Sequence, residues 1–271
     1  MHSANKTFEI YRINGYRDSL SVNISYTSIC IRNGKMDKSQ QDSKETHKSM
    51  EIMEAIRNRH SVRKFKNVDI EPGIFAQIRN EMFQCNDESG LNIQLQINEP
   101  KAFNCFLAHY GHFENVKNYL CMIGPNKKTL DENIGYYGER LVLKAQQLGV
   151  DSCWVGMSYS RGNAVFELRD DEKLVCLIAL GHGVDKGTPH KSKDIAKVTK
   201  VTGEMPEWFK KGVESALLAP TAVNQQKFMF ELVGDHKVSC YTKGIGFYTK
   251  VDLGIVKYHF EVGAGEPFEW A

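Results

Sequence analysis

Long apolar runs are missing from this sequence. No window approaches the roughly 20 apolar residues that a membrane-spanning helix needs. The N-terminus also lacks the apolar core of a secretory signal peptide. We therefore expect a protein without membrane contact that resides in the cytoplasm.

Cysteine pairs and metal-ligand spacings are missing as well. The seven cysteines form no C-x-x-C pair, and their odd number suits free thiols in a reducing compartment better than a disulfide framework. His109 and His112 lie near each other, but no carboxylate or cysteine partner recurs at ligand spacing. We expect no metal site.

The basic residues do not form blocks. They are interleaved with acids, and the formal net charge is only +2, so we expect no nucleic-acid partner. The partner should be a small molecule. With 271 residues, of which 41% are hydrophobic, the chain can bury a large core in one sizeable domain or two small ones.

The first 49 residues differ from the rest of the chain. Residues 33–48 are almost wholly polar and charged, which is the composition of a linker or a disordered segment. Residues 8–31 contain short alternating runs. We treat residues 1–49 as an N-terminal extension without an assigned function, which could be a tail, an added strand or an upstream segment, and residues 50–271 as the folded domain.

From Met50 onward, helical and strand patterns alternate. Apolar residues at helical spacing predict the longest helix over residues 131–148, with Gly149 ending it. The other predicted helices cover residues 51–58, 72–82, 206–218 and 252–263, and the predicted strands cover residues 116–123, 174–180, 228–233 and 238–241, the last two as a hairpin.

The run Arg59-His60-Ser61-Val62-Arg63 follows directly after the first predicted helix. Two guanidiniums and a hydroxyl two residues apart, where a helix gives way to extended chain, can converge on one phosphate with bidentate geometry. This pattern predicts an anion site. A solvated basic helix end is the alternative, because arginine near a helix C-terminus also suits the helix dipole.

A second polar segment, residues 219–226, reads Ala-Pro-Thr-Ala-Val-Asn-Gln-Gln. It lies between the amphipathic stretch 206–218 and the apolar run 228–233, so a helix ends into a turn that leads to a strand. Such a turn leaves small polar groups and free backbone N–H donors that can hold a polar ring edge. An ordinary helix-to-strand loop is the alternative.

Together, Arg-x-Ser-x-Arg and Ala-Pro-Thr-Ala-x-Asn-x-Gln resemble the nitroreductase family of FMN-dependent oxidoreductases. Residues 141–156 resemble the family's central helix and the loop after it, and residues 181–193 resemble its late basic segment. The resemblance covers roughly residues 50–271. It implies an α+β fold with a central mixed or antiparallel sheet flanked by helices.

The order of these motifs departs from the family. Ordinary members carry Pro-Ser-x-x-Asn about thirty residues after the arginine run, whereas here the motif appears near Pro220. Ordinary members are homodimers in which one subunit gives the arginines and the other gives this loop. The order therefore indicates a fused pseudo-dimer, with unequal halves of about 50–200 and 201–271 related by a pseudo-twofold, and the chain could act as a monomer. Weak similarity between residues 134–145 and 253–264 supports this interpretation.

The resemblance also implies a cofactor and its site. FMN would be bound and NAD(P)H would be the co-substrate. The implied phosphate ligands are Arg59, Ser61 and Arg63 with His60 beside them, together with Lys191 and Lys193, for which a solvated loop is the alternative. The implied ring contacts are Trp154, Val155, Gly156, Pro220, Thr221, Ala222 and Asn224, with core packing as the alternative for Trp154.

No side chain stands out as a general acid or a nucleophile, so the flavin would carry the chemistry. The expected activity is an NAD(P)H-dependent FMN oxidoreductase that reduces a nitroaromatic, a quinone or a similar acceptor. A flavin-binding protein without turnover, acting as a store or sensor, is the alternative. The phosphate and ring motifs are expected equally for both.

Overall fold

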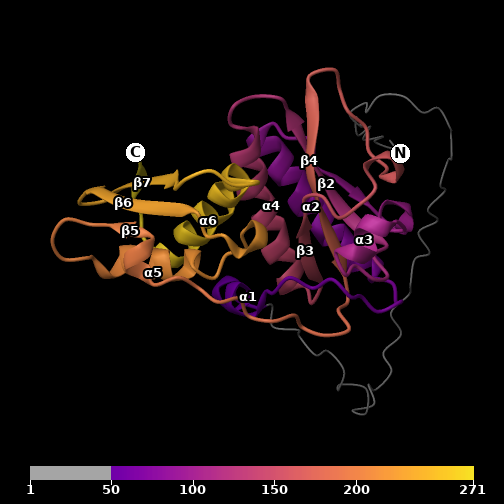
Figure 1. The fold of residues 1–271 in the computed structure, drawn as a ribbon, viewed down its shortest axis with the longest axis horizontal. Helices are drawn as coiled ribbons and strands as arrows, with labels where there is room; N and C mark the ends of the chain where they lie inside the picture. Colours follow the sequence, from indigo (N-terminus) through magenta and orange to yellow (C-terminus); the bar gives the residue numbers. More distant parts are fainter. Residues whose placement is uncertain (1–49) are drawn as a thin grey trace, which may run out of the picture. The chain divides into compact units, whose positions relative to one another are not determined.

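The computed structural model describes residues 50–271, and the extension expected at residues 1–49 lies outside the described residues. This part of the chain folds into α-helices and two four-stranded sheets, which confirms the predicted α+β class (Figure 1). The helices are α1 (Ile52–Asn58), α2 (Pro72–Ser89), α3 (Phe106–Tyr110), α4 (Leu130–Gln147), α5 (Glu207–Ala216) and α6 (Thr249–Ala264).

The first sheet is antiparallel throughout, in the order β1-β2-β4-β3. Its strands are β1 (Gln94–Gln96), β2 (Asn118–Pro125), β3 (Asp151–Val155) and β4 (Glu172–Gly181). β2 is apolar on both faces because Leu120 and Met122 join one core with α2 and α4, while Tyr119 and Cys121 join a second core on the other face. A strand covered on both sides reads as a continuous apolar run.

The second sheet is mixed, in the order β5-β6-β7-β8. Its strands are β5 (Thr199–Lys200), β6 (Phe228–Gly234), β7 (Lys237–Thr242) and β8 (Glu269–Trp270). β6 and β7 form the predicted hairpin, and the short strands β5 and β8 pair with its two edges in parallel. Phe230 of β6 stacks on Phe260 of α6 with 4.7 Å between ring centroids, so this sheet packs on α6.

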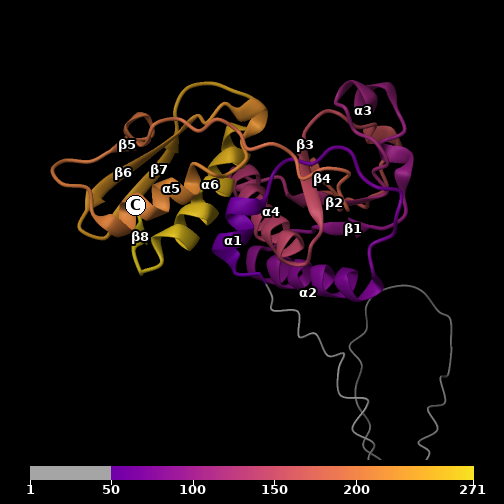
Figure 2. The same ribbon diagram turned by 90° about the horizontal axis from the view of Figure 1, so that it is seen from below.

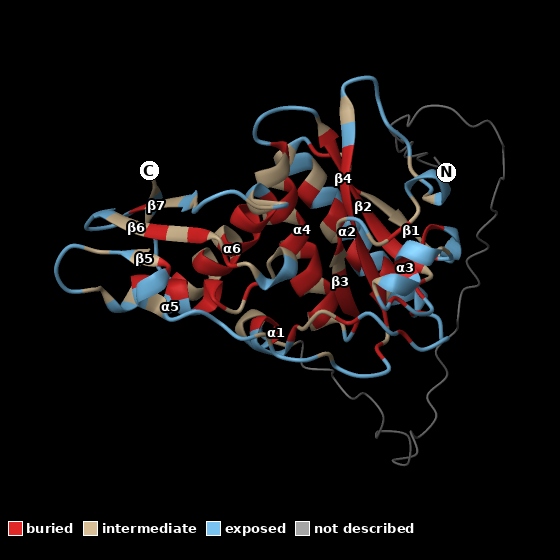
Figure 3. Cartoon of the chain, in the orientation of Figure 1, coloured by how far each residue is buried: buried red, intermediate tan, exposed pale blue. Residues whose placement is uncertain are grey.

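Helices α4 and α6 lie side by side between the two sheets (Figures 1 and 2). Two glycines make this close approach possible. A Cβ on Gly135 would overlap the carbonyl oxygen of Val251, and a Cβ on Gly254 would overlap that of Glu132. The inner surfaces of α4, α6, β2 and β4 are the most buried part of the molecule (Figure 3).

Four of the strands, β1, β3, β5 and β8, were not predicted from the sequence. Residues after the long helix were expected to form a loop, but Asp151–Val155 is strand β3 and pairs with β4. The prediction for α4 is confirmed to within one residue, and Gly149 adopts a φ of +76° just after it, as a helix-ending glycine does. Among the helices of residues 50–271, none combines the length and the apolar character needed to cross a membrane.

Candidate functional site

The arginine run lies alongside strand β3. The chain leaves α1 at Arg59, which is extended with φ −70° and ψ 121°. The N–H of Val62 donates to the carbonyl of Ser152 at 3.0 Å, and Ser61 forms a parallel bridge with Ser152. Val62 is buried in the core. Because side chains alternate along an extended chain, Arg59, Ser61 and Arg63 share the opposite side.

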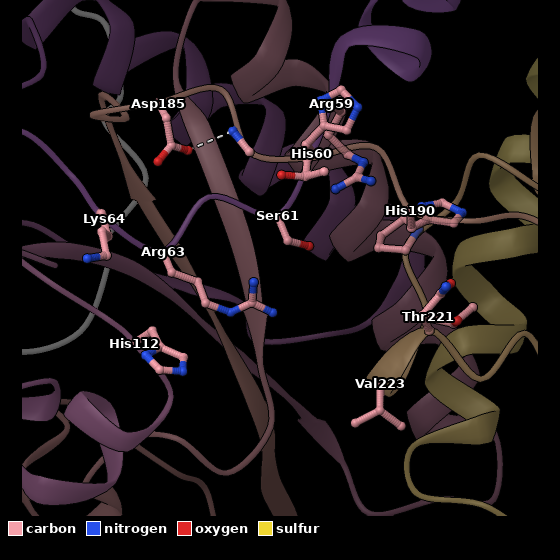
Figure 4. A pocket seen from close by; sticks show the side chains of 14 residues that line it. Arg59, His60, Ser61, Arg63, Lys64, His112, Asp185, His190, Thr221 and Val223 are labelled. Carbon is pink, nitrogen blue, oxygen red and sulfur yellow. Dashed lines mark hydrogen bonds between the residues drawn. The ribbon is translucent and has the colours of Figure 1, made fainter.

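A cavity of about 440 Å³ opens on that side of the run (Figure 4). In Figure 4 the side chains of Ser61 and Arg63 extend toward the part of the cavity where Thr221 and Val223 lie. The lining holds cations and imidazoles against one carboxylate: Arg59, Arg63, Lys64, His60, His112 and His190 against Asp185. We call this space the cationic cavity.

Lys64 and Asp185 of the cationic cavity have partners of their own. The Nζ of Lys64 lies 2.7 Å from the Glu114 carboxylate, and Asp185 accepts a 2.8 Å hydrogen bond from the N–H of Gly187. Burial, followed by the charge of Arg59, lowers the pKa of His60. The guanidiniums therefore dominate the charge of this cavity, which favours an anionic ligand.

A second cavity of about 240 Å³ adjoins the first and is mainly apolar. The two share Ser61, Arg63, Pro220, Thr221 and Val223. The remaining lining comprises Trp154, Val155, Gly156, Met157, Ser158, Cys176, Ala222, Phe247, Tyr248, Val251, Asp252 and Ile255. We call it the apolar cavity.

Gly156 and Tyr248 pack directly against each other in the apolar cavity. A Cβ on Gly156 would lie 2.5 Å from the Tyr248 ring, so only glycine fits at this position. The Tyr248 hydroxyl donates a 2.9 Å hydrogen bond to the Gly156 carbonyl. The end of β3 is thereby held against the start of α6, and the Gly156 backbone can approach a ligand closely.

The turn after α5 closes both cavities. Val223, Asn224 and Gln226 have φ values of +46°, +52° and +45°, and Val223 is 92% exposed. A positive φ is uncommon for any residue with a Cβ and strained for β-branched valine, and such strain gathers at ligand sites. The surrounding contacts must therefore hold this turn in place.

Asp252 of α6 provides two of those contacts. Its Oδ1 accepts from the N–H of Ala222 at 2.9 Å, and its Oδ2 accepts from Nε2 of Gln225 at 2.7 Å. Burial raises the pKa of Asp252 to about 6, although both hydrogen bonds act in the opposite direction. Asp252 also lines the apolar cavity, so any ligand in that cavity would lie beside a titratable carboxylate.

Most of the residues expected to bind the cofactor come together. Arg59, His60, Ser61, Arg63, Trp154, Val155, Gly156, Pro220, Thr221, Ala222 and Asn224 line one or both cavities. In the described part of the chain, Lys191 and Lys193 line neither. The Nζ of Lys193 donates to the carbonyls of Gln225 and Gln226 at 2.9 and 2.8 Å, while the Lys191 carbonyl accepts from Asn224 and Gln226. Residues 191–193 therefore stabilise the turn after α5 through hydrogen bonds.

Two residues that shape the site were missed by sequence reasoning: Asp252 and Glu139. Asp252 lies in the first turn of α6, where only the folded chain shows which groups face the turn after α5. Glu139 gave no signal in the sequence. It lies on the side of α4 away from the apolar stripe of Ile134, Leu141 and Ala145, where a charged residue is expected to be exposed, yet it is completely buried. Within residues 50–271, no three His, Cys, Asp or Glu side chains gather as metal ligands would.

The chain is similar to several solved nitroreductase structures. A "putative nitroreductase" from Thermotoga maritima aligns with a TM-score of 0.56 and 22% identity over 83% of this chain and 87% of that one, which shows a shared fold. Nitroreductases crystallised with FMN from Desulfovibrio desulfuricans and Exiguobacterium sibiricum align with TM-scores of 0.45 and 0.44 and identities of 17% and 16%. They cover 57% and 55% of this chain, and 96% and 95% of theirs.

No match was found among curated proteins. A family model described as "Putative TM nitroreductase" matches residues 51–264, which include α1 to α6, all but the last of the strands, and every residue that lines the two cavities. A match of this extent leaves only residues 1–50 and 265–271 outside the family's pattern. The chain therefore belongs to this nitroreductase family.

Proposed function

We propose that this protein binds FMN and passes hydride from NAD(P)H through it to a nitroaromatic, a quinone or a similar flat acceptor. The main observation behind this proposal is the pair of adjoining cavities. One is cationic, the other is apolar, and both are lined by Ser61, Arg63 and Thr221. A flavin nucleotide has the same division into a charged end and a flat ring. The FMN complexes of two similar nitroreductases support this proposal.

The phosphate would lie in the cationic cavity. Arg59 and Arg63 are its proposed ligands, because guanidiniums bind phosphate oxygens with bidentate, charge-assisted hydrogen bonds. Ser61 adds a hydroxyl donor between them, and His190 faces the same space. Lys191 and Lys193 take no direct part in this proposal, since their contacts serve the turn after α5.

The ring would lie in the apolar cavity, between the end of β3 and the turn after α5. FMN accepts and returns hydride at its own ring, so the protein supplies binding, orientation and electrostatics. Val155 and Gly156 offer backbone to the ring, Thr221 offers a hydroxyl from the turn, and Ala222 adds an apolar contact. Val251 and Ile255 give an apolar lining that excludes water.

The acceptor would enter by the exposed rim of the apolar cavity. Met157, Val223 and Phe247 line this cavity and are 65%, 92% and 74% exposed. Large exposed apolar side chains that gather around a cavity are typical of a ligand-binding surface. A small, flat and largely apolar acceptor fits that rim best.

Two measurements test the proposal. The absorption spectrum of the purified protein should show bound flavin, and heat-released cofactor should be FMN. Steady-state oxidation of NADH and NADPH should then depend on an added nitroaromatic or quinone. Flavin without turnover under any of these conditions would favour the store or sensor, and no flavin at all would contradict both functions.

A further inference from the structure

A charged residue lies fully buried in the core behind the cationic cavity. Glu139 of α4 has no exposed surface, and its carboxylate meets three side chains. Nε1 of Trp154 donates to Oε2 at 2.9 Å, Nε2 of His259 lies 2.9 Å from Oε1, and Nε of Arg59 lies 3.8 Å from Oε1. We call Arg59, Glu139, Trp154 and His259 the buried charge cluster.

Hydrogen-bond geometry and the lowered pKa of Glu139 together indicate the charges in this cluster. Nδ1 of His259 lies 3.1 Å from the carbonyl of Ser215, which can only accept, so Nδ1 carries a proton. Burial opposes a charged Glu139, but the hydrogen bond and charge of His259, followed by the charge of Arg59, hold its pKa below the usual value. A carboxylate on Glu139 then requires Nε2 of His259 to donate, which makes His259 a cation.

Arg59 depends on this carboxylate. The arginine is only 4% exposed, and burial lowers its pKa while the charge of Glu139 raises it. A buried cation without a partner is strongly disfavoured. Within the described residues Nε of Arg59 has no hydrogen-bond partner, so its attraction to Glu139 orients that side of the guanidinium inward. The remaining N–H groups are left for the cavity that Arg59 lines.

The same carboxylate also holds the wall of the apolar cavity. Trp154 lies on β3 just before Val155 and Gly156, and its indole lies against Gly138, where a Cβ would overlap the ring. The N–H of the indole ends on Glu139. One side chain therefore contacts the proposed phosphate ligand Arg59, the strand that offers backbone to the ring, and His259 of α6.

We propose that Glu139 is a positioning residue of the cofactor site. It offsets the cost of burying the Arg59 guanidinium and directs that guanidinium at the phosphate, while its second oxygen fixes Trp154 at the ring end. The inference rests on the proposed function, because it takes FMN as the ligand of the two cavities. Glu139 acts through Arg59 and Trp154 and has no contact with the cofactor itself.

The experiment is a double-mutant cycle with two ligands. Glu139→Gln removes the charge but keeps the shape, and its amide can accept from Trp154 and donate to a neutral His259. FMN and riboflavin affinities are measured by flavin fluorescence for the wild type, Glu139→Gln, Arg59→Ala and the double variant. Glu139→Gln should weaken FMN binding about tenfold, as loss of a charge-assisted contact does, and should leave riboflavin binding within about twofold.

The cycle separates positioning from a general effect on folding. In the Arg59→Ala background, Glu139→Gln should change FMN affinity by less than about twofold, because the group it acts through is already absent. Equal losses for FMN and riboflavin, or independent losses that multiply in the double variant, would overturn the inference. A wild-type chain that binds neither ligand would instead contradict the proposed function.

Two further variants guard the interpretation. Glu132→Gln is the matched control, because Glu132 also lies on α4 and also bridges to α6, with 2.5 Å to Nζ of Lys257, but it lines neither cavity. It should leave both affinities unchanged. If Glu139→Gln does not fold, Glu139→Asp keeps the charge and withdraws it by one methylene from both Arg59 and Trp154, so FMN affinity should fall and riboflavin affinity should fall less. Equal losses for both ligands in Glu139→Asp would also overturn the inference.

Discussion

Arg59 and Arg63 contribute to the cationic cavity in different ways. Arg59 is buried and balanced by Glu139, whereas Arg63 is exposed at the junction of the two cavities. Arg63→Ala should therefore remove a phosphate contact with little effect on the fold. A charge-assisted hydrogen bond contributes about 1.5 to 3 kcal/mol, so FMN affinity should fall roughly tenfold to a hundredfold.

Isothermal titration of the apo-protein checks this, with riboflavin as the ligand that lacks a phosphate. Riboflavin affinity should barely change in Arg63→Ala. Arg57→Ala is the matched control, because Arg57 is exposed on the last turn of α1 and lines neither cavity. An equal loss of riboflavin affinity in Arg63→Ala would contradict the phosphate assignment.

Asp252 should make stability depend on pH. Its pKa is raised from 3.8 to about 6 by burial, so the folded chain binds this proton more tightly than the unfolded chain does. The stabilisation from that proton is complete below the unfolded pKa and is lost as the pH rises through about 6. A shift of this size corresponds to about 3 kcal/mol between pH 4 and pH 7.

Asp252→Asn removes the titration, so its free energy of unfolding should fall less steeply between pH 4 and pH 7 than that of the wild type. Urea unfolding at several pH values gives the two curves, and the difference in slope is the result that counts. Asp235→Asn, at an exposed turn, should run parallel to the wild type. Parallel curves for Asp252→Asn would show that Asp252 does not titrate in this range.

At the scale of elements, the crossing of α4 and α6 determines how the two sheets are joined. Gly254→Ala would place a methyl group on the Glu132 carbonyl and the Tyr136 amide, neither of which can move without distorting α4. Overpacking of this kind typically costs 1 to 3 kcal/mol or more, so the melting temperature should fall by several degrees.

Gly73→Ala provides a control of the opposite sign. Gly73 lies in the first turn of α2, and no atom lies within 4 Å of the position a Cβ would take. Alanine is favoured over glycine in helices by up to about 1 kcal/mol, so Gly73→Ala should be neutral or slightly stabilising. Differential scanning calorimetry of both variants checks the pair, and similar melting temperatures would contradict the tight crossing.

The sequence predicted the elements whose pattern is local. α4 carries a clear apolar stripe ended by Gly149, and β4 is a continuous apolar run, so both were placed closely. β1, β3, β5 and β8 were missed because each has five residues or fewer and owes its conformation to a partner strand. Pairing between distant segments leaves little trace in such short stretches.

The site shows the same division. The arginine run and the turn after α5 each have a distinctive local sequence, and both line the cavities. Lys191 and Lys193 matched a pattern by type alone, and their contacts brace the turn. The partners of Glu139 come from three separate elements, so no window of the sequence could have shown them together.

At the scale of the whole molecule, the two parts of the domain repeat one succession of elements. α2, β1, β2, α4 and β3 in the first part correspond in order to α5, β6, β7, α6 and β8 in the second, while α1, α3 and β4 of the first part have no counterpart. The contacts at the helix crossing are reciprocal, since each glycine faces the carbonyl three residues before the other. These features support our proposal that the domain is a fused pseudo-dimer.

The repeat also indicates why only one flavin should bind. Trp154 follows α4 on β3 and lies against Gly138, three residues after Gly135. Trp270 follows α6 on β8, and three residues after Gly254 stands Lys257, whose Nζ lies 5.1 Å from the Trp270 ring centroid. Beside Trp270, Lys257, which pairs with Glu132, therefore occupies the place that Gly138 occupies beside Trp154.

We predict a monomer that binds one FMN per chain, because residues 59–63 and 220–224 of the same polypeptide face the same two cavities. Light scattering and FMN titration measure mass and stoichiometry.

A mixing experiment tests whether the two sides of the FMN site, residues 59–63 and 220–224, come from the same chain. Arg59→Ala lacks one side, and the double variant Thr221→Ala/Asn224→Ala lacks the other. If each site lies within one chain, an equimolar mixture should bind FMN no better than its components. Recovery of wild-type affinity in a fraction of the sites would show that the two sides come from different chains, as in an ordinary homodimer, and would refute the single-chain site.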